Sequence, residues 1–515
     1  MPDNAGLTLD FASLPRASAV PVQGHALMQN YTNPNDAFTL ELQRINSLMT
    51  MGDLPQAAQA LNRAQLQRPG DARIYLLGIQ LAEKAGNAAG ALQAAERAVK
   101  AAPDWPVSLM EAAALLLRQG RFNDALPLAR RAMAISPDDL NVVRRAVLVA
   151  LKSGNAEAAT AWLHRLVALA PHERAFRDLF AKQLLANRDA AQAKAVYDAL
   201  VEEQPEDVMA RSGRIQAALA LGDLAVAESD AQMLLAQQPD NPDYAYWLAL
   251  AQGKTPHTQP DSLVKERFDN FADHFDVTLW RQLEYRVPQL VAEFLLKTHP
   301  DRRFNVLDLG CGTGLVGVCL GPLNGFIIGV DLSEEMIRKA AQHGIYERFH
   351  SVNVLDALRE TPADHYEAIT CCDVLVYVGD LSEVIPNALR ILKPGGHFLF
   401  SCEAAEEDEA DVLLRATGRY AHKASAVQRW CEQAGFESVQ IEHLPKLRME
   451  DGVPLPGFLV IARKPAAACS APCSASTCWA PTPPATRGAG GSRSTTAWSR
   501  RRSSCPWAPT APSRA

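Results

Sequence analysis

Hydrophobic and polar positions follow two different patterns along this chain. Between residues 38 and 241 the pattern repeats every 34 residues, whereas beyond residue 300 short apolar runs are bounded by glycine. Three residue types keep the 34-residue period at once, which chance does not produce. The prolines are Pro69, Pro103, Pro137, Pro171, Pro205 and Pro239, the alanines are Ala57, Ala91, Ala125, Ala159, Ala193 and Ala227, and the glycines are Gly52, Gly86, Gly120, Gly154 and Gly222. Arg188 stands where one further glycine would fall.

Each of the three positions has a physical reason. The glycine ends a first helix, the alanine allows a second helix to approach closely, and the proline ends that second helix. A helix–turn–helix unit of 34 residues resembles the tetratricopeptide repeat, so we expect an α-solenoid of six repeats and a capping helix over residues 38–253. Such a solenoid suits a protein or peptide partner. The alternative is a rigid spacer or an oligomerisation arm.

The first short apolar run beyond residue 300 leads into a glycine-rich turn. Residues 304–309 are too few for a helix and stop at a glycine, which predicts a buried strand. Gly310, Gly312 and Gly314 then fall on alternate positions. Glycines at this spacing let the main chain turn sharply and bring bare backbone N–H groups against a ligand.

A carboxylate follows the second short apolar run. Residues 326–330 predict another buried strand, and Asp331 ends it, 21 residues after Gly310. In nucleotide-binding βαβ units a carboxylate at this place accepts hydrogen bonds from the ribose hydroxyls. Ser333 can cap the helix that follows, which leaves Asp331 available to a ligand.

The motif DLGCGTG followed by Asp331 resembles the S-adenosylmethionine site of class I methyltransferases. An oxidoreductase that binds NAD would need a third glycine at position 315, where this chain has Leu315. The resemblance continues through residues 366–378 and 392–403 and covers roughly 264–464. It implies an α/β domain after the solenoid: a Rossmann-like, seven-stranded class I methyltransferase domain with S-adenosyl-L-methionine as cofactor.

The same resemblance implies which residues bind the cofactor. The glycine-rich turn passes close to the methionine moiety, Asp331 holds the ribose, and Arg286 pairs with the methionine carboxylate. By the same resemblance, Asn353 contacts the adenine, with Asp356 as the alternative. The expected cofactor residues are Asp308, Gly310, Gly312, Gly314, Asp331, Leu332, Asn353, Asp356, Asp373, Tyr285 and Arg286.

The methyl acceptor is harder to predict. If the acceptor must lose a proton, His422 is the first candidate base, with Tyr420 and His274 behind it. A lone histidine in a loop is more often structural. The segments FADHFD, DVLVYVGDL, GRYAH and LRMEDG, preceded by the repeats, resemble the methyltransferases linked to tetratricopeptide repeats, a type whose acceptor the resemblance does not supply. The fourth strand lacks the Pro-Pro-aromatic motif of amide and adenine methyltransferases, so those acceptors are excluded.

Composition narrows the choice of partners. The chain carries a formal net charge of −7, but residues 466–515 hold six Arg and no Asp, Glu or Lys, so the remainder carries 45 minus 58, or −13. Such acidity excludes a general nucleic-acid backbone binder. No apolar run approaches 18 residues and no zinc-type cysteine pairs occur, so we expect a cytoplasmic protein with no membrane contact and no metal.

These patterns divide the chain into five regions. They are a disordered leader (1–37), the repeat solenoid (38–253), a linker (254–263), the methyltransferase domain (264–464) and a disordered low-complexity tail (465–515) that resembles out-of-frame translation. We predict a methyltransferase whose repeats recruit a partner or the substrate, which is a protein, a carrier-borne group or a small molecule. The alternative is a repeat scaffold whose methyltransferase-like domain only binds the cofactor.

Overall fold

The computed structural model describes residues 36–271, 285–415, 417–450 and 453–466. Most of the predicted leader and tail, and also His274, lie outside these residues. The chain forms two compact units, which are Met1–Glu284 with Met449–Val453, and Tyr285–Arg448 with Pro454–Ala515. No helix in the described ranges is long and apolar enough to cross a membrane.

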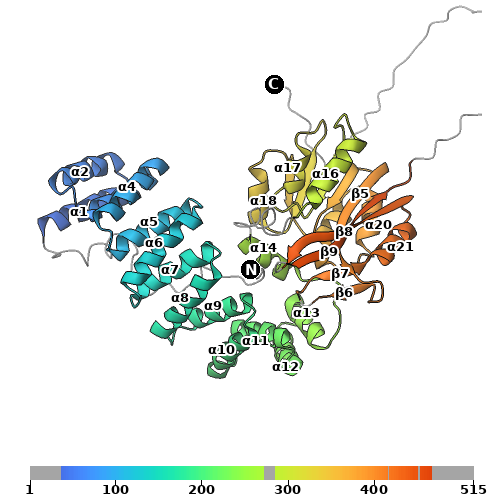
Figure 1. The fold of residues 1–515 in the computed structure, drawn as a ribbon, viewed down its shortest axis with the longest axis horizontal. Coiled ribbons are helices and arrows are strands. Elements are labelled where there is room, and N and C mark those ends of the chain that lie inside the picture. Colours follow the sequence, from blue (N-terminus) through green and yellow to red (C-terminus); the bar gives the residue numbers. More distant parts are fainter. Residues whose placement is uncertain (1–35, 272–284, 416, 451–452, 467–515) are drawn as a thin grey trace, which may run out of the picture. The chain divides into compact units, whose positions relative to one another are not determined.

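The described helices of residues 36–271 follow one another in pairs, one helix pair for each predicted repeat (Figure 1). The pairs are α1 (Ala37–Thr50) and α2 (Leu54–Gln67), α3 (Ala72–Lys84) and α4 (Ala88–Ala101), α5 (Pro106–Arg118) and α6 (Phe122–Ile135), α7 (Leu140–Lys152) and α8 (Ala156–Leu169), α9 (Arg174–Ala186) and α10 (Ala190–Glu203), and α11 (Val208–Leu221) and α12 (Leu224–Gln237). A capping helix, α13 (Pro242–Ala251), follows them, so the predicted solenoid is confirmed.

The three periodic positions do what the sequence predicted. All six periodic alanines are at most 1% exposed, because neighbouring helices pack directly against them. Each second helix ends two residues before the periodic proline. The periodic glycines have φ between 63° and 84°, a conformation that costs other residues about 1 kcal/mol or more. Arg188 takes the same conformation, with φ of 62°.

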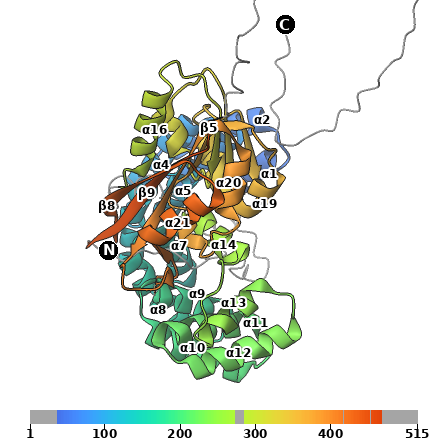
Figure 2. The ribbon, with the colours of Figure 1, turned by 90° about the vertical axis from the view of Figure 1, so that its right-hand side faces the viewer.

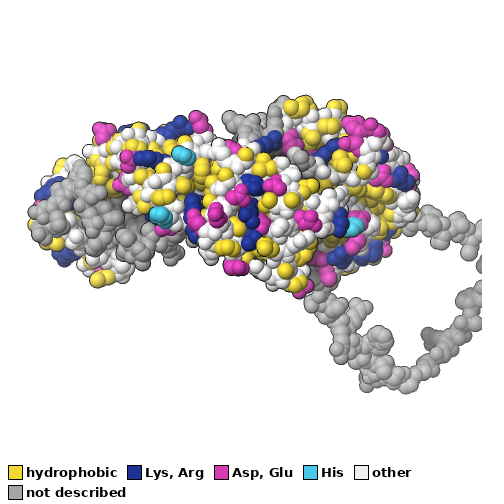
Figure 3. All heavy atoms as spheres, turned by 90° about the horizontal axis from the view of Figure 1, so that it is seen from below, with side chains coloured by type: hydrophobic (Ala, Val, Ile, Leu, Met, Phe, Trp, Pro, Cys, Tyr) yellow, Lys and Arg dark blue, Asp and Glu magenta, His cyan; other side chains and the backbone are white. Residues whose placement is uncertain are grey.

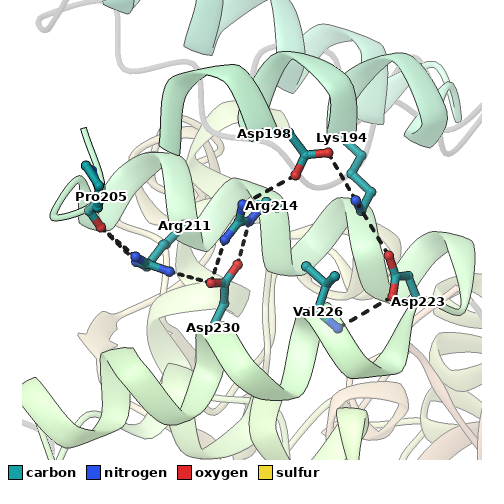
Figure 4. A network of polar contacts seen from close by, with 8 residues as sticks. All are labelled: Lys194, Asp198, Pro205, Arg211, Arg214, Asp223, Val226 and Asp230. Atoms are coloured by element: carbon teal, nitrogen blue, oxygen red, sulfur yellow. Dashed lines mark hydrogen bonds and ion pairs between the residues drawn. The ribbon is translucent and has the colours of Figure 1, made fainter. Parts of the chain in front are cut away.

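A buried ion-pair cluster in the last repeat extends to the preceding repeat through partly exposed pairs (Figure 4). Asp230 on α12 is 2% exposed and accepts hydrogen bonds from Arg211, at 2.5 Å, and from Arg214, at 2.7 and 2.8 Å. Arg214 also reaches Asp198 on α10 at 3.4 Å, and Lys194 pairs with Asp198 at 3.0 Å. Removing either guanidinium would leave a buried carboxylate poorly paired, which is costly, so this network fixes α10, α11 and α12 together.

A further helix, α14 (Asp261–Phe271), belongs to the first unit. Leu263 packs against the cluster that contains Tyr244 and Trp247 of α13, and the Ser262 hydroxyl donates a hydrogen bond to Asp243. The two units divide between Glu284 and Tyr285, which groups α14 with the solenoid.

The second unit is built on one sheet with the strand order β3-β2-β1-β4-β5-β7-β6, and β9 pairs with both β5 and β8. The strands are β1 (Val306–Leu309), β2 (Ile327–Asp331), β3 (Arg348–Ser351), β4 (Tyr366–Cys371), β5 (Leu392–Ala405), β6 (Val412–Leu414), β7 (Tyr420–Lys423), β8 (Ser438–Glu450) and β9 (Val453–Arg463). Strands β1 to β5 pair in parallel, whereas β9 runs antiparallel to β5.

Helices cover this sheet and connect its parallel strands. They are α16 (Val287–Thr298), α17 (Leu315–Leu320), α18 (Glu334–Ala341), α19 (Val354–Glu360), α20 (Val384–Ile391) and α21 (Ala424–Ala434), with a short 3-10 helix at Leu375–Tyr377. Figure 2 shows α19, α20 and α21 side by side. Because β1, β2 and β4 are parallel neighbours, their carboxyl ends meet at one edge of the sheet, where ligands bind in α/β folds.

The sheet differs from the prediction at one end. In the described part it has nine strands, two more than expected, because β6 and β7 form in the segment between β5 and α21. The sequence predicts a loop around His422 in this segment. These strands contain only three and four residues, so their periodicity is too short to detect, and they depend on pairing with the end of β5.

Basic and acidic side chains lie close together on the face of the molecule that Figure 3 shows. Along the solenoid, Arg118 pairs with Glu83 at 2.7 Å and Arg177 pairs with Glu203 at 2.5 Å. A nucleic-acid backbone binds to a surface stripe of positively charged side chains, whereas on this face positive and negative side chains are mixed.

Candidate functional site

The glycine-rich turn lies directly after β1, at the carboxyl edge of the sheet. Gly310 has φ of 65°, and a Cβ atom placed on it would lie 2.2 Å from a methyl carbon of Val374. Only glycine therefore fits between β1 and the segment after β4. Gly312 and Gly314 also have positive φ, and Gly314 is the N-cap of α17. The turn thus places bare backbone beside the end of β4.

Asp331 ends β2 and points back to this turn. Its Oδ2 accepts the backbone N–H of Gly312 at 2.8 Å, and its Oδ1 accepts the N–H of Ser333 at 2.9 Å. Ser333 caps α18, since its hydroxyl oxygen accepts the N–H of Met336 at 3.2 Å, as the sequence predicted. Both carboxylate oxygens of Asp331 thus accept backbone hydrogen bonds, and its contact with the ribose stays a prediction.

Asp308 is buried inside the unit, at 1% exposure, and does not reach the surface of the site. Tyr346 donates a hydrogen bond to its Oδ2 at 2.6 Å, and Thr370 donates one to its Oδ1 at 2.7 Å. Burial raises the pKa of Asp308 to about 6, although both hydrogen bonds lower it. The Tyr346 oxygen also accepts the Gly317 N–H at 3.1 Å, so Asp308 and Tyr346 join β1 to α17.

The residues expected near adenine follow β2 and β3. The Leu332 carbonyl accepts a hydrogen bond from the Ser351 hydroxyl at 3.4 Å. Asn353 is the N-cap of α19, and its side-chain oxygen accepts the Leu355 N–H at 2.7 Å. Asp356 is exposed and pairs with Arg359 at 3.0 Å. Both Asn353 and Asp356 thus have helical partners, and their contact with adenine stays a prediction.

A buried ion-pair cluster lies at the carboxyl ends of β4 and β5. Asp373 has φ of 58°, and its N–H donates to the Ser401 hydroxyl at 2.8 Å. Arg448 on β8 is 1% exposed and pairs with Asp373 at 2.5 Å through Nη1 and with Glu403 through Nη2. Sequence reasoning found Asp373 but missed Arg448 and Glu403, although the LRMEDG motif contains this arginine.

Tyr285 and Arg286 begin the described part of the second unit. Tyr285 is 5% exposed, and burial raises its pKa well above the usual value, with the nearby charge of Asp373 adding to the shift. Its hydroxyl therefore lies close to the Asp373 cluster. Arg286 is the N-cap residue of α16 and is exposed. Their contact with the methionine end of the cofactor stays a prediction.

The candidate bases occupy a strand where the sequence predicted a loop. Tyr420 and His422 belong to β7, and both are fully buried at 0% exposure. His422 Nε2 lies 3.0 Å from the Gly379 carbonyl oxygen, and burial lowers the histidine pKa to about 4. The neutral imidazole thus donates to the turn at Gly379. A role for His422 or Tyr420 as acceptor base stays a prediction, and His274 lies outside the described residues.

Comparison with known families identifies both halves of the chain. A family model described as a methyltransferase domain matches residues 279–441. Models described as tetratricopeptide repeats match residues 116–182, and residues 42–106 and 179–242. The chain is a tetratricopeptide-repeat protein with a class I methyltransferase domain. This repeat-linked methyltransferase is an enzyme, and S-adenosylmethionine is its cofactor.

Relatives of the repeat-linked methyltransferase match its second half. A ubiquinone biosynthesis O-methyltransferase of Methylococcus capsulatus is 27% identical over 187 residues, which cover 32% of this chain and 77% of the relative. The enzyme of the same name from Hydrogenovibrio crunogenus is 28% identical over 121 residues, which cover 23% of this chain and 50% of the relative. Among solved structures, the [4+2]-cyclase SpnF aligns with 17% identity and a TM-score of 0.36, over 41% of this chain and 98% of SpnF. A TM-score this low adds nothing to the assignment.

Proposed function

We propose that this protein transfers the methyl group of S-adenosylmethionine to a hydroxyl group, on an acceptor that the repeats recruit. The observation that carries the proposal is the edge formed by β1, β2 and β4. There the Gly310 turn follows β1, Asp331 ends β2 and Asp373 follows β4, at the carboxyl ends of neighbouring parallel strands. The O-methyltransferase name of the relatives favours oxygen as the accepting atom.

The residues present fit the cofactor. Gly310, Gly312 and Gly314 offer bare backbone after β1, and Asp331 stands at the end of β2, where a carboxylate accepts the ribose hydroxyls. When bound, S-adenosylmethionine supplies a methyl group activated by its sulfonium charge. The chain supplies proximity and orientation, because displacement at that carbon needs the acceptor in line with the breaking bond. Asp331 holds the ribose, and the glycine turn fixes the methionine end.

The repeats support a recruiting role. Six repeats in a single solenoid offer a long surface, and the two functions lie on one chain. A partner held by the solenoid is confined near the methyltransferase domain, which raises its effective concentration by orders of magnitude over free diffusion. A protein acceptor or a carrier-borne acceptor benefits from this, whereas a small molecule does not. We also place the protein in the cytoplasm, which fits the free thiols of its described cysteines.

The proposal is tested by methyl transfer from tritium-labelled S-adenosylmethionine. The full chain is incubated with lysate from cells that lack this protein, so that acceptors are unmethylated. We expect label in a protein or carrier fraction, and no label with the Asp331→Ala variant. Label in low-molecular-weight material would identify a small acceptor and contradict recruitment. Cofactor binding without any transfer would support the scaffold alternative and contradict the enzymatic proposal.

A further inference from the structure

We propose that Asp373 is the catalytic residue that receives the methyl acceptor, and that one of its two carboxylate oxygens takes up the acceptor's hydroxyl proton. This inference rests on the proposed function, because it assigns the acceptor side of the same site. It gives Asp373 to the acceptor in place of the cofactor contact that the resemblance implied. Three features of the described residues support it, namely the position of Asp373, the way its backbone is held, and the state of its two oxygens.

The position of Asp373 is beside the methionine end of the cofactor site. Asp373 follows β4, and its neighbour Val374 packs so closely on Gly310 that a Cβ atom on this glycine would lie 2.2 Å from Val374. The Gly310 turn is the backbone that we assign to the methionine moiety. A group that follows β4 at this point therefore lies on the side from which an acceptor must approach the methyl carbon.

The backbone of Asp373 is held in an unusual conformation. Its φ of 58° lies in the left-handed region, which non-glycine residues adopt rarely and at a cost of about 1–3 kcal/mol. The Ser401 hydroxyl accepts the Asp373 N–H at 2.8 Å, and Arg448 Nη1 holds Oδ1 at 2.5 Å. Strained residues that are fixed by several neighbours concentrate at functional sites, where they pre-position a group.

The two oxygens of Asp373 differ in their surroundings. Oδ1 is bound by Arg448, whereas Oδ2 makes no hydrogen bond with any described residue, and the side chain is 21% exposed. Two further polar atoms in the cluster also lack hydrogen-bond partners among the described residues. They are the hydroxyl of Tyr285, a residue 5% exposed, and Nε of Arg448, a residue 1% exposed. A polar ligand at this point would satisfy groups that the protein leaves unpaired.

The geometry gives the following step. The acceptor hydroxyl donates a hydrogen bond to Oδ2 of Asp373. As the acceptor oxygen forms its bond to the methyl carbon, the bond from that carbon to sulfur breaks and its electron pair stays on sulfur. The acceptor proton passes to Oδ2, and the partly exposed carboxyl group then releases it to water. No other reactant is needed. The acceptor is thus a hydroxyl compound, with its O–H directed at a carboxylate.

The competing explanation is that the cluster only attaches β8 to the sheet. Arg448 pairs with Glu403 as well as with Asp373, and Glu403 is 2% exposed on β5. If the cluster only attaches β8, removal of either carboxylate should lower the transfer rate to the same extent. A role in receiving the acceptor predicts that only Asp373 matters for transfer, because Glu403 is the buried one. Glu403 therefore provides a matched control.

The test compares Asp373→Asn and Glu403→Gln in the full chain. Asparagine tolerates the left-handed conformation as aspartate does, so the first variant keeps the backbone and removes the acidic group. Each variant is assayed for single-turnover transfer of tritiated methyl to the lysate acceptors described above, for cofactor affinity by calorimetry, and for melting temperature. We expect Asp373→Asn to lower the transfer rate by about 100-fold, with cofactor affinity and melting temperature close to wild type. We expect Glu403→Gln to lower the melting temperature while its transfer rate stays within about threefold.

Three outcomes would overturn the inference. Equal losses of transfer in both variants would assign the cluster to attachment of β8. Transfer by Asp373→Asn above about one-tenth of the wild-type rate would remove the need for its carboxylate. If the wild-type chain binds S-adenosylmethionine but transfers no label, the proposed function itself fails and the inference fails with it.

Discussion

The Tyr346 hydroxyl donates a 2.6 Å hydrogen bond to Oδ2 of Asp308, and both side chains are buried. The same hydroxyl oxygen accepts the N–H of Gly317 at 3.1 Å. The Tyr346 hydroxyl thus connects Asp308 in β1 with Gly317 in α17, the two elements that flank the glycine-rich turn. Gly310, Gly312 and Gly314 carry no side chains, so the shape of the turn depends in part on such outside support.

Replacing Tyr346 by phenylalanine tests this connection. The ring keeps its stacking on Phe349, with centroids 4.9 Å apart, but Asp308 loses a donor and Gly317 an acceptor. We expect the free energy of unfolding of the methyltransferase unit to fall by about 1–3 kcal/mol, because buried polar groups are left unpaired. Urea unfolding followed by tryptophan fluorescence measures it. An unchanged midpoint would mean that the two hydrogen bonds do not contribute.

The pKa of Asp308, raised to about 6, makes stability depend on pH. A carboxyl group whose folded-state pKa lies above its unfolded value of about 3.9 binds a proton more tightly when folded. Its contribution to stability is complete below about pH 4 and is lost as the pH rises through about 6. We therefore expect wild type to lose about 2 kcal/mol relative to Asp308→Asn between pH 4 and pH 7. Parallel stability curves for the two proteins would contradict a raised pKa.

Asp331 is predicted to hold the ribose, and Asp331→Ala tests that assignment. We expect cofactor binding to weaken by roughly 2–3 kcal/mol, because two ribose hydroxyls lose their acceptor. Isothermal calorimetry with S-adenosylmethionine measures the loss. Ser333→Ala is the matched control, since it removes the cap of α18 at a cost of about 1 kcal/mol of stability and is expected to leave cofactor binding unchanged. Equal affinity of Asp331→Ala and wild type would refute the assignment.

Arg188 has the left-handed conformation that the other repeats give to glycine. Arg188→Gly removes the steric cost, so we expect stability to rise by about 1 kcal/mol. Gly154 has the same position in the preceding helix pair, so Gly154→Ala is the reverse change. The added Cβ would meet no other atom, so only the strained backbone conformation counts, and we expect a destabilisation of similar size. Thermal unfolding of both variants measures the effect. Shifts of the same sign would contradict it.

The sequence predicted those features whose causes are local. The helix pairs follow from single residues that end or pack helices, and Ser333 caps α18 because a hydroxyl at that place meets its own backbone. The strand after which Asp331 stands follows from a short apolar run. Each of these depends on neighbours within a few positions, so a periodic pattern is enough to predict it.

The partners of buried polar groups were not predictable. Arg448 and Asp373 are 75 residues apart, and Tyr346 and Asp308 are 38 apart. Only the sheet brings them together, since β8 and β4 are not consecutive strands. His422 shows the same limit, because its burial on β7 depends on pairing with β5. A polar residue in a sequence does not show whether it will face a ligand or another buried charge.

Removing part of the solenoid separates recruitment from chemistry. Leu263 of α14 packs on the cap formed by α13, so a cut after the cap would expose apolar surface. Deleting residues 1–171 instead removes the first four repeats and keeps the last two with their Asp230 network and the cap. Repeats contact mainly their neighbours, so we expect the remaining chain to fold and to bind S-adenosylmethionine as wild type does. Calorimetry checks that control.

If the repeats recruit the acceptor, labelled transfer should fall by about tenfold or more, because the acceptor must then arrive by diffusion. The deleted repeats, added as a separate polypeptide, should not restore it, since a separate chain gives no effective concentration. Full transfer by the shortened protein would show that the first four repeats do not deliver the acceptor.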